Sequence, residues 1–106
     1  MNRNEKVANL IRELAASFLV KEDNRTSLIT ITSTTVSPDL KRATVYMTVL
    51  PEAKEKLALE FVKRKRGELR EFLKKNMTTK VVPFLDVAID LGEKNRQKID
   101  ELLKIS

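Results

Sequence analysis

The densest cluster of chemically active side chains is a group of cations in the second half of the chain. It comprises Lys63, Arg64, Lys65, Arg66, Arg70, Lys74 and Lys75. Arg66, Arg70 and Lys74 recur every four residues, so on a continuous helix they would share one face. Such a stripe can follow a phosphate backbone, and each phosphate that it neutralises adds affinity that falls with salt. Because Glu68 and Glu71 lie among these cations, a solvated helix face is the competing interpretation.

A second basic site lies at the end of a predicted hairpin. Lys41 and Arg42 begin a strand that also carries Tyr46, and Lys80 adds a further cation before the last strand. Tyr46 could stack on a base. A lone strand tyrosine is more often a cross-strand packing residue, and aromatic residues make up 5% of the chain, so we do not predict an aromatic stacking platform. Together with the seven cations of the first cluster, Lys41, Arg42 and Lys80 make up the predicted RNA-binding set.

Three carboxylates provide an enzymatic alternative. Asp39, Asp86 and Asp90 lie at predicted strand ends, where two of them could converge, bind a metal or serve a nuclease or phosphotransfer reaction. Aspartates at such positions usually end strands or cap turns and helices. Asp90, two residues before Gly92 and the last helix, fits a capping role.

The missing residue types exclude several classes of enzyme. The chain has no Cys and no His, which removes disulfides, thiolate metal sites, imidazole acid–base chemistry and the usual zinc ligands. Its two glycines cannot form a dinucleotide-binding fingerprint, a P-loop or a GxxG clamp. We therefore expect a protein that is not an enzyme, with no catalytic residue, no metal, no cofactor and no small-molecule substrate.

Charge and length indicate the class of partner. The chain has 106 residues, 21 Lys and Arg against 15 Asp and Glu, a net charge of +6 and a pI near 9.7. Such a balance favours nucleic acid as partner, with an anionic membrane surface second and a merely soluble basic protein as the alternative. One core and one domain over residues 1–106 fit this length. There is no membrane-spanning run and no leader pattern, so the cytoplasm is the expected location.

Apolar periodicity predicts an α+β fold in the order α-β-β-α-α-β-α. The expected helices cover residues 4–20, 52–65, 68–77 and 93–104, and the first two strands cover residues 28–36 and 42–50. Gly67 is expected to interrupt the helix pair. The stretch from Thr78 to Val82 is β-prone, and the alternation of Leu85, Val87 and Ile89 continues it into a third strand with a bend at Pro83.

The second strand has two unlike faces. Its small and apolar residues, Ala43, Val45, Met47 and Val49, alternate with Arg42, Thr44, Tyr46 and Thr48. The first set should be buried, and the second should face solvent or a partner.

Two stretches, in this element order, resemble the bacterial ribosome-binding factor A family. Ser37-Pro38-Asp39-Leu40-Lys41-Arg42-Ala43-Thr44-Val45-Tyr46-Met47 is similar to the family's S-x-D-L-x-x-A-x-V-Y turn and strand. Lys80-Val81-Val82-Pro83-Phe84-Leu85, running on to Asp90, is similar to its basic-x-x-P-x-L segment. Ile99, Leu102 and Leu103 match a terminal I-x-x-L-L, so the resemblance covers nearly the whole chain.

The resemblance implies a single type II KH-like domain, with helices packed on one face of a three-stranded sheet. An interrupted helix pair would face RNA. Members of the family lack the GxxG loop and have an A-x-G kink; here the matching positions are Lys65-Arg66-Gly67, so the glycine is kept and a lysine adds charge where RNA is expected.

The functional hypothesis that follows is a monomeric, non-catalytic factor for late maturation of the small ribosomal subunit. The resemblance implies binding to the free subunit and its 16S rRNA, a role near the rRNA 5′ end and neck, and a part in cold adaptation. Another KH-like RNA binder, such as a ribosomal protein or an mRNA regulator, stays open from the residues, as does a protein-interaction module.

Overall fold

The computed structural model describes residues 3–21, 27–79 and 81–105 of the chain. Its elements are α1 (Arg3–Lys21), β1 (Leu28–Val36), β2 (Arg42–Leu50), the short 3-10 helix η1 (Glu52–Lys54), α2 (Glu55–Arg64), α3 (Arg66–Asn76), β3 (Phe84–Ile89) and α4 (Leu91–Ile105). This is the predicted α+β order, with β2 in the centre of the sheet, antiparallel to β1 and parallel to β3.

Burial of one face of β2 organises the fold. Ala43 and Val45 pack with Ile11 of α1 and Leu69 of α3. Met47 and Val49, farther along the same face, belong to a second cluster with α2 and β3 residues. These four side chains belong to alternate residues of β2 and therefore point to the same face of the sheet. Since they pack with residues of α1, α2 and α3, all three helices cover that face. Within the described ranges, the other face has no helical layer over most of its length. Thr48 on that face is nevertheless buried, so the prediction that it would face solvent or a partner was wrong.

A bulge in β1 was not predicted. The β1–β2 register shifts between Ile31 and Ser33, so Thr32 is an extra residue on β1. Its hydroxyl donates a hydrogen bond of 2.6 Å to Asp90 Oδ2. The bulge thereby links β1 to the start of α4.

The break in the helix pair lies at Lys65, and the prediction that it falls at Gly67 was wrong by two residues. Lys65 has φ −88° and ψ 0°, and it separates α2 from α3. Gly67 is in the first turn of α3, does not have a positive φ, and would have nothing within 4 Å of an added Cβ. The backbone at position 67 therefore does not require glycine.

The stretch before Pro83 is not a strand. Residues 77–79 and 81–83 are irregular, Lys80 lies outside the described residues, and β3 begins only at Phe84. Proline has no N–H for a ladder, and the carbonyl oxygens of Val82 and Pro83 accept hydrogen bonds from the Arg70 side chain. Hydrogen bonds from the Arg70 side chain thus take the place of strand pairing in the segment before Phe84. The β propensity of its residues alone does not reveal this.

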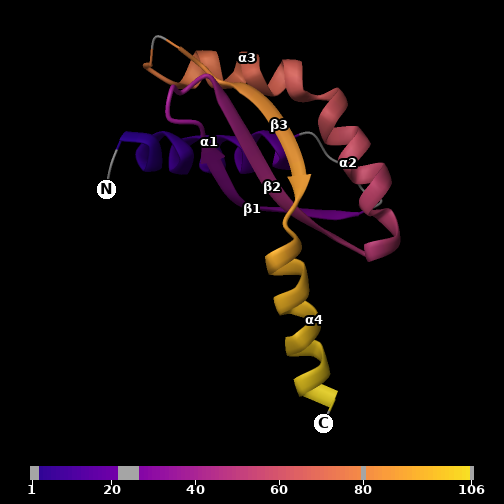
Figure 1. Ribbon diagram of the computed structural model, residues 1–106. Helices are drawn as coiled ribbons and strands as arrows, with labels where there is room; N and C mark the ends of the chain where they lie inside the picture. Colours follow the sequence, from indigo (N-terminus) through magenta and orange to yellow (C-terminus); the bar gives the residue numbers. More distant parts are fainter. Residues whose placement is uncertain (1–2, 22–26, 80, 106) are drawn as a thin grey trace.

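Helix α4 extends away from the body formed by the sheet and the other helices (Figure 1). Ile99, Leu102 and Leu103 on this helix are exposed. In the described ranges, no helix combines the length and apolar character needed to cross a membrane.

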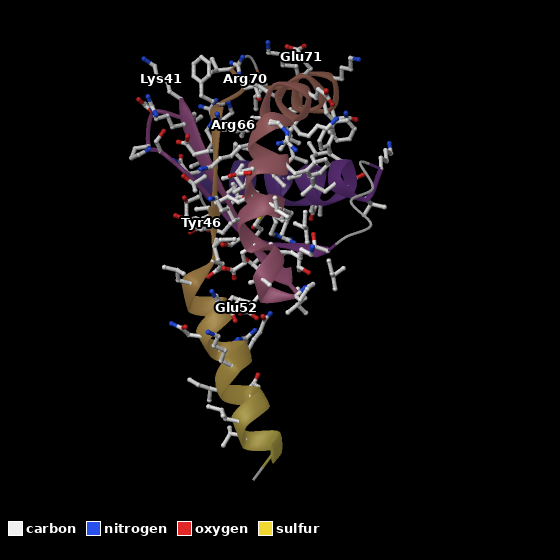
Figure 2. All side chains as sticks on the ribbon, turned by 90° about the vertical axis from the view of Figure 1, so that its right-hand side faces the viewer. Lys41, Tyr46, Glu52, Arg66, Arg70 and Glu71 are labelled. Atoms are coloured by element: carbon white, nitrogen blue, oxygen red, sulfur yellow. The ribbon has the colours of Figure 1, made fainter. Side chains whose placement is uncertain are left out.

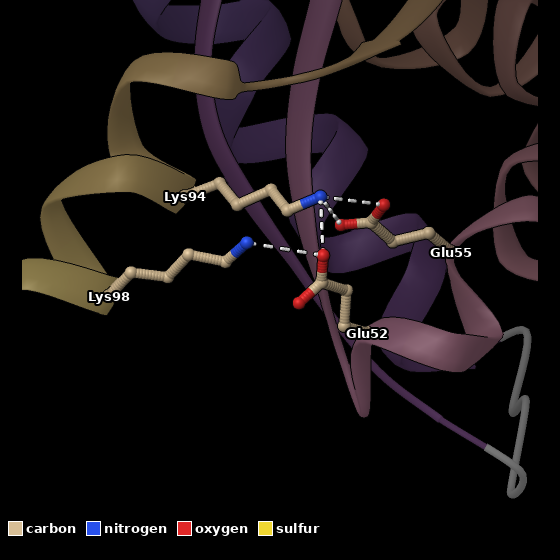
Figure 3. A network of polar contacts seen from close by, with 4 residues as sticks. All are labelled: Glu52, Glu55, Lys94 and Lys98. Carbon is tan, nitrogen blue, oxygen red and sulfur yellow. Dashed lines mark hydrogen bonds and ion pairs between the residues drawn. The ribbon is translucent and has the colours of Figure 1, made fainter. Parts of the chain in front are cut away.

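The base of α4 is attached to the body by charged groups (Figure 3). Lys94 Nζ lies 3.0 Å from both Glu52 and Glu55, and Lys98 Nζ lies 3.3 Å from Glu52. These contacts lower the pKa of Glu52 and raise that of Lys94. Asp90 caps the helix by accepting a hydrogen bond from the Glu93 amide at 3.0 Å, as its position before Gly92 predicted.

The first prediction concerns this cap. The Glu93 amide and then the Thr32 hydroxyl lower the pKa of Asp90, so its contribution is present above about pH 4 and is lost as pH falls through the folded-state pKa. Asp90→Ala should lower the free energy of unfolding by about 1 kcal/mol at neutral pH. The difference from the parent protein should shrink in acid, as measured by urea unfolding at several pH values. Asp100→Ala, an exposed change on the same helix, is the control; an equal loss there would contradict the assignment.

A second prediction concerns Gly67. Because its helical position leaves room for a Cβ, Gly67→Ala should raise the free energy of unfolding by about 0.5 kcal/mol through the higher helix propensity of alanine. Chemical denaturation measures the change. Destabilisation would mean that the backbone at residue 67 is not that of a helix.

Candidate nucleic-acid interface

The turn at Lys65 places Arg66 beside the edge strand β3. Arg66 Nε donates a hydrogen bond of 3.1 Å to the Lys63 carbonyl oxygen, and its Nη1 lies 3.8 Å from Asp86 Oδ1 on β3. Asp86 is exposed and the ion pair is long, so it adds little stability. The Arg66 charge is thus held at the edge of the sheet and stays exposed.

Arg70, one turn later, is a structural cation. Its Nε and Nη2 donate hydrogen bonds of 3.3 and 3.0 Å to the carbonyl oxygens of Pro83 and Val82. Its guanidinium carbon also lies 4.4 Å from the centre of the Phe84 ring. Val82 and Pro83 are buried residues and both hydrogen bonds are partly buried, so Arg70 supplies donors to carbonyl groups whose access to water is limited. These contacts fix the chain at the start of β3.

The cations at the hairpin end lie next to the same part of β3. Arg42 is the register partner of Phe84, and Arg42 Nη1 lies 3.9 Å from Asp86 Oδ2. The Lys41 carbonyl accepts a hydrogen bond of 2.9 Å from the Phe84 amide. In Figure 2, Lys41, Arg66 and Arg70 all lie toward the upper part of the body, whereas Glu52 lies near α4. Arg42 of the hairpin site and Arg66 of the helix site therefore meet at Asp86 on β3.

The predicted cations differ in how available they are. Lys41, Lys63, Arg64 and Lys75 are exposed, and none of their side chains forms an ion pair or hydrogen bond within the described part of the chain. Lys74 pairs with Glu71 at 3.2 Å.

The lysine at the helix break is also partnered. Lys65 Nζ lies 3.4 Å from Glu68 and 5.9 Å from the centre of the Phe61 ring. The stripe expected at four-residue spacing thus consists of residues with local partners. Of the cations predicted to bind RNA, those of α2 that remain exposed without a partner in the described ranges are Lys63 and Arg64. The assignment of Lys80 lies outside the described residues.

The predicted carboxylates do not form a joint site. Asp39 is in the turn before β2, where the Ser37 hydroxyl and the Lys41 amide donate to it and lower its pKa. Asp90 is at the other end of the sheet and caps α4. Asp86 lies within β3 and not at a strand end. Over the described ranges, no group of three or more acidic residues could hold a metal ion. The enzymatic alternative thereby loses the convergence that it required.

Phe84 belongs to this surface and was not singled out from the sequence. Its neighbours Leu85 and Val87 point into the core, so Phe84 and Asp86 share the open face. The alternation along residues 84–89 was a usable signal, but without the position of Arg70 it gave no reason to prefer Phe84. Tyr46, half-buried on the open face of β2, has Ser33 and Ala88 as its register neighbours.

Comparison of the amino-acid sequence with protein families identifies a family that matches nearly the whole chain. The model of the family described as "Ribosome-binding factor A" matches residues 3–103. The chain belongs to the ribosome-binding factor A family. The resemblance noted in the turn-and-strand motif and before β3 is thereby confirmed over nearly the whole length.

Individual family members agree with this assignment. The chain is 35% identical over 106 residues to ribosome-binding factor A of Geobacter sulfurreducens, covering 97% of this chain and 90% of that protein. The crystal structure of ribosome-binding factor A from Thermus thermophilus matches with a TM-score of 0.72 at 21% identity, covering 83% of this chain and 97% of that one. A Thermus thermophilus ribosome-binding factor A model fitted into the cryo-EM map of a 30S–RbfA complex matches with a TM-score of 0.68 at 20% identity, covering 76% and 88%.

The third prediction separates Arg70 from the other cations of α3. Arg70→Met keeps an extended apolar stem but leaves the carbonyl groups of Val82 and Pro83 without their donors, so the free energy of unfolding should fall by about 1–3 kcal/mol. Lys75→Met, at an exposed position of the same helix, should change it by less than about 0.5 kcal/mol. Urea unfolding of both variants gives the comparison. Equal effects would mean that the Arg70 hydrogen bonds contribute no specific stability.

Proposed function

We propose that this protein is a non-catalytic assembly factor that binds the small ribosomal subunit through its 16S rRNA. The observation that carries the proposal is family membership over residues 3–103. The fold relative fitted into a 30S complex supports the choice of the small subunit. The net charge of +6 suits a partner rich in phosphate.

The RNA-binding surface is the basic region around β3. Exposed Lys63 and Arg64 at the end of α2, and Lys41 and Arg42 at the hairpin end, would contact phosphates. Phosphate contacts position a protein on RNA without reading sequence. Specificity would then come from RNA shape and from the neighbouring ribosomal proteins.

The finer role that we propose is assistance in late maturation at the 5′ end of 16S rRNA, with a greater need in the cold. The factor would bind the free subunit as a monomer in the cytoplasm. Separate structural roles for Asp39 and Asp90 support a part in RNA binding rather than in cleavage.

The test is co-sedimentation of the purified protein with isolated small and large ribosomal subunits over a salt series. The protein should sediment with the small subunit at low salt and dissociate as salt rises, because phosphate neutralisation releases counterions. Preference for the large subunit, or no association at low salt, would refute the proposal.

The fourth prediction locates the RNA-binding surface. The double variant Lys63→Glu with Arg64→Glu should lose small-subunit binding by at least about tenfold, because two phosphate-facing cations become repulsive. Its thermal stability should fall only modestly. Both side chains are exposed and have no partner in the described ranges, but they lie in the last turn of α2, where reversing two cations costs about 1 kcal/mol through the helix dipole.

The matched control is Lys6→Glu with Lys56→Glu. It changes the net charge equally at exposed positions on α1 and α2 that lie outside the predicted RNA-binding set. Equal loss of binding in both double variants would indicate an effect of net charge alone. Unaltered binding in the first would place the RNA surface elsewhere.

A further inference from the structure

We propose that Phe84 is a stacking site for one unpaired nucleobase at the centre of the basic surface. The inference rests on the proposed function and deepens it, because it adds contact with a base to contacts that are otherwise made with phosphate. The ligand class is a single-stranded nucleotide segment, with its base on the Phe84 ring and its phosphates on the flanking cations.

Phe84 is exposed and at the same time held in place. Phe84 is 64% exposed on the open face of the sheet, although its strand neighbours Leu85 and Val87 are buried. The Arg70 guanidinium lies over the ring at 4.4 Å and is itself fixed by the carbonyl oxygens of Val82 and Pro83. One side of the ring therefore has a cation on it, and a large part of the ring is left for a partner.

This arrangement lowers the cost of binding a base. A ring whose neighbours are already fixed loses less side-chain freedom when a ligand stacks on it. Aromatic side chains contribute to single-strand binding because each base has a flat face that can stack, whatever its identity. With the Arg70 guanidinium on one side of the ring, a base would stack on the part of the ring that is left exposed.

The charges around the ring favour a nucleotide over an apolar ligand. Arg42 is its register partner on β2, and the Lys41 carbonyl holds its amide. Asp86, the acidic residue two positions along β3, lies within ion-pair distance of Arg42 and Arg66. A phosphate next to a stacked base would thus meet Arg42 and Arg66, whose contacts with Asp86 are long, at 3.9 and 3.8 Å.

Among the described residues, the other large apolar side chains that are exposed are aliphatic. Leu57 on α2 is similarly exposed at 58%, but it is aliphatic and offers no flat ring on which a base or a guanidinium could stack. Single exposed apolar residues are common on protein surfaces, so Leu57 provides the matched control. The combination of an exposed ring, a fixed guanidinium and flanking arginines distinguishes Phe84.

The experiment uses a spectroscopic reporter and a truncation in the full chain. The protein contains no Trp, so Phe84→Trp introduces a single indole at this position. Its fluorescence is followed during titration with short oligoadenylate, and with inorganic polyphosphate as a polyanion without bases. Binding of both ligands to Phe84→Leu and Leu57→Ala is measured in parallel by anisotropy competition.

Oligoadenylate should quench the indole of Phe84→Trp, and polyphosphate should bind without quenching it. Phe84→Leu should lose about tenfold in affinity for oligoadenylate, within the range of one base–aromatic stack. Its affinity for polyphosphate should be unchanged, and Leu57→Ala should match the parent protein with both ligands.

Two results would overturn the stacking site. One is oligoadenylate binding that leaves the indole emission unchanged, and the other is equal oligoadenylate affinity of the parent protein and Phe84→Leu. Co-sedimentation with the small subunit is measured separately on the parent protein, so the stacking site can fail while the assembly-factor proposal stands. Failure of co-sedimentation with retained quenching would refute the assembly-factor proposal and leave a base-stacking RNA binder.

Discussion

Burial of a single face of β2 is the constraint on which the rest of the structure depends. Ala43, Val45, Met47 and Val49 are almost fully buried, and each core cluster contains two of them. Since all three helices of the body pack on this face, the described residues form no second helical layer on the opposite one. The sheet can then present Arg42 on β2 and Phe84 on β3 to a partner.

The basic surface shows that a cation's position in the sequence does not reveal its role. Arg70 belongs to the same run as Lys63 and Arg64, yet its guanidinium is used to hold the segment before β3. Lys63 and Arg64 have no such duty among the described residues. Under the proposed function, one helix pair would thus serve two purposes. Arg70 supplies donors to carbonyl groups at the edge of the sheet, and the exposed cations of α2 would contact phosphates.

Helix α4 is joined to the body at its base. Asp90 caps it and accepts a hydrogen bond from Thr32 in the β1 bulge, while Lys94 bridges Glu52 and Glu55. The direction of the helix thus depends on polar contacts from three separate elements. The apolar residues Ile99, Leu102 and Leu103 lie beyond these contacts and are exposed, so apolar periodicity in α4 does not indicate burial in this chain.

The amino-acid sequence by itself determined the element order, the buried face of β2, the cap at Asp90 and the family, because these depend on local periodicity, turn chemistry and a motif with fixed spacing. The tertiary structure alone decided the break at Lys65, the bulge at Thr32, the irregular segment before Phe84 and the setting of the Phe84 ring. The bulge at Thr32 depends on a hydrogen bond to Asp90, which is distant in the sequence. The irregular segment and the setting of the Phe84 ring both depend on Arg70, which donates to the carbonyl groups of Val82 and Pro83 and lies over the ring. The break at Lys65 depends on how α2 and α3 pack on different parts of one sheet. Propensity describes a residue and its neighbours along the chain, whereas these features arise from hydrogen bonds and packing that only folding brings together.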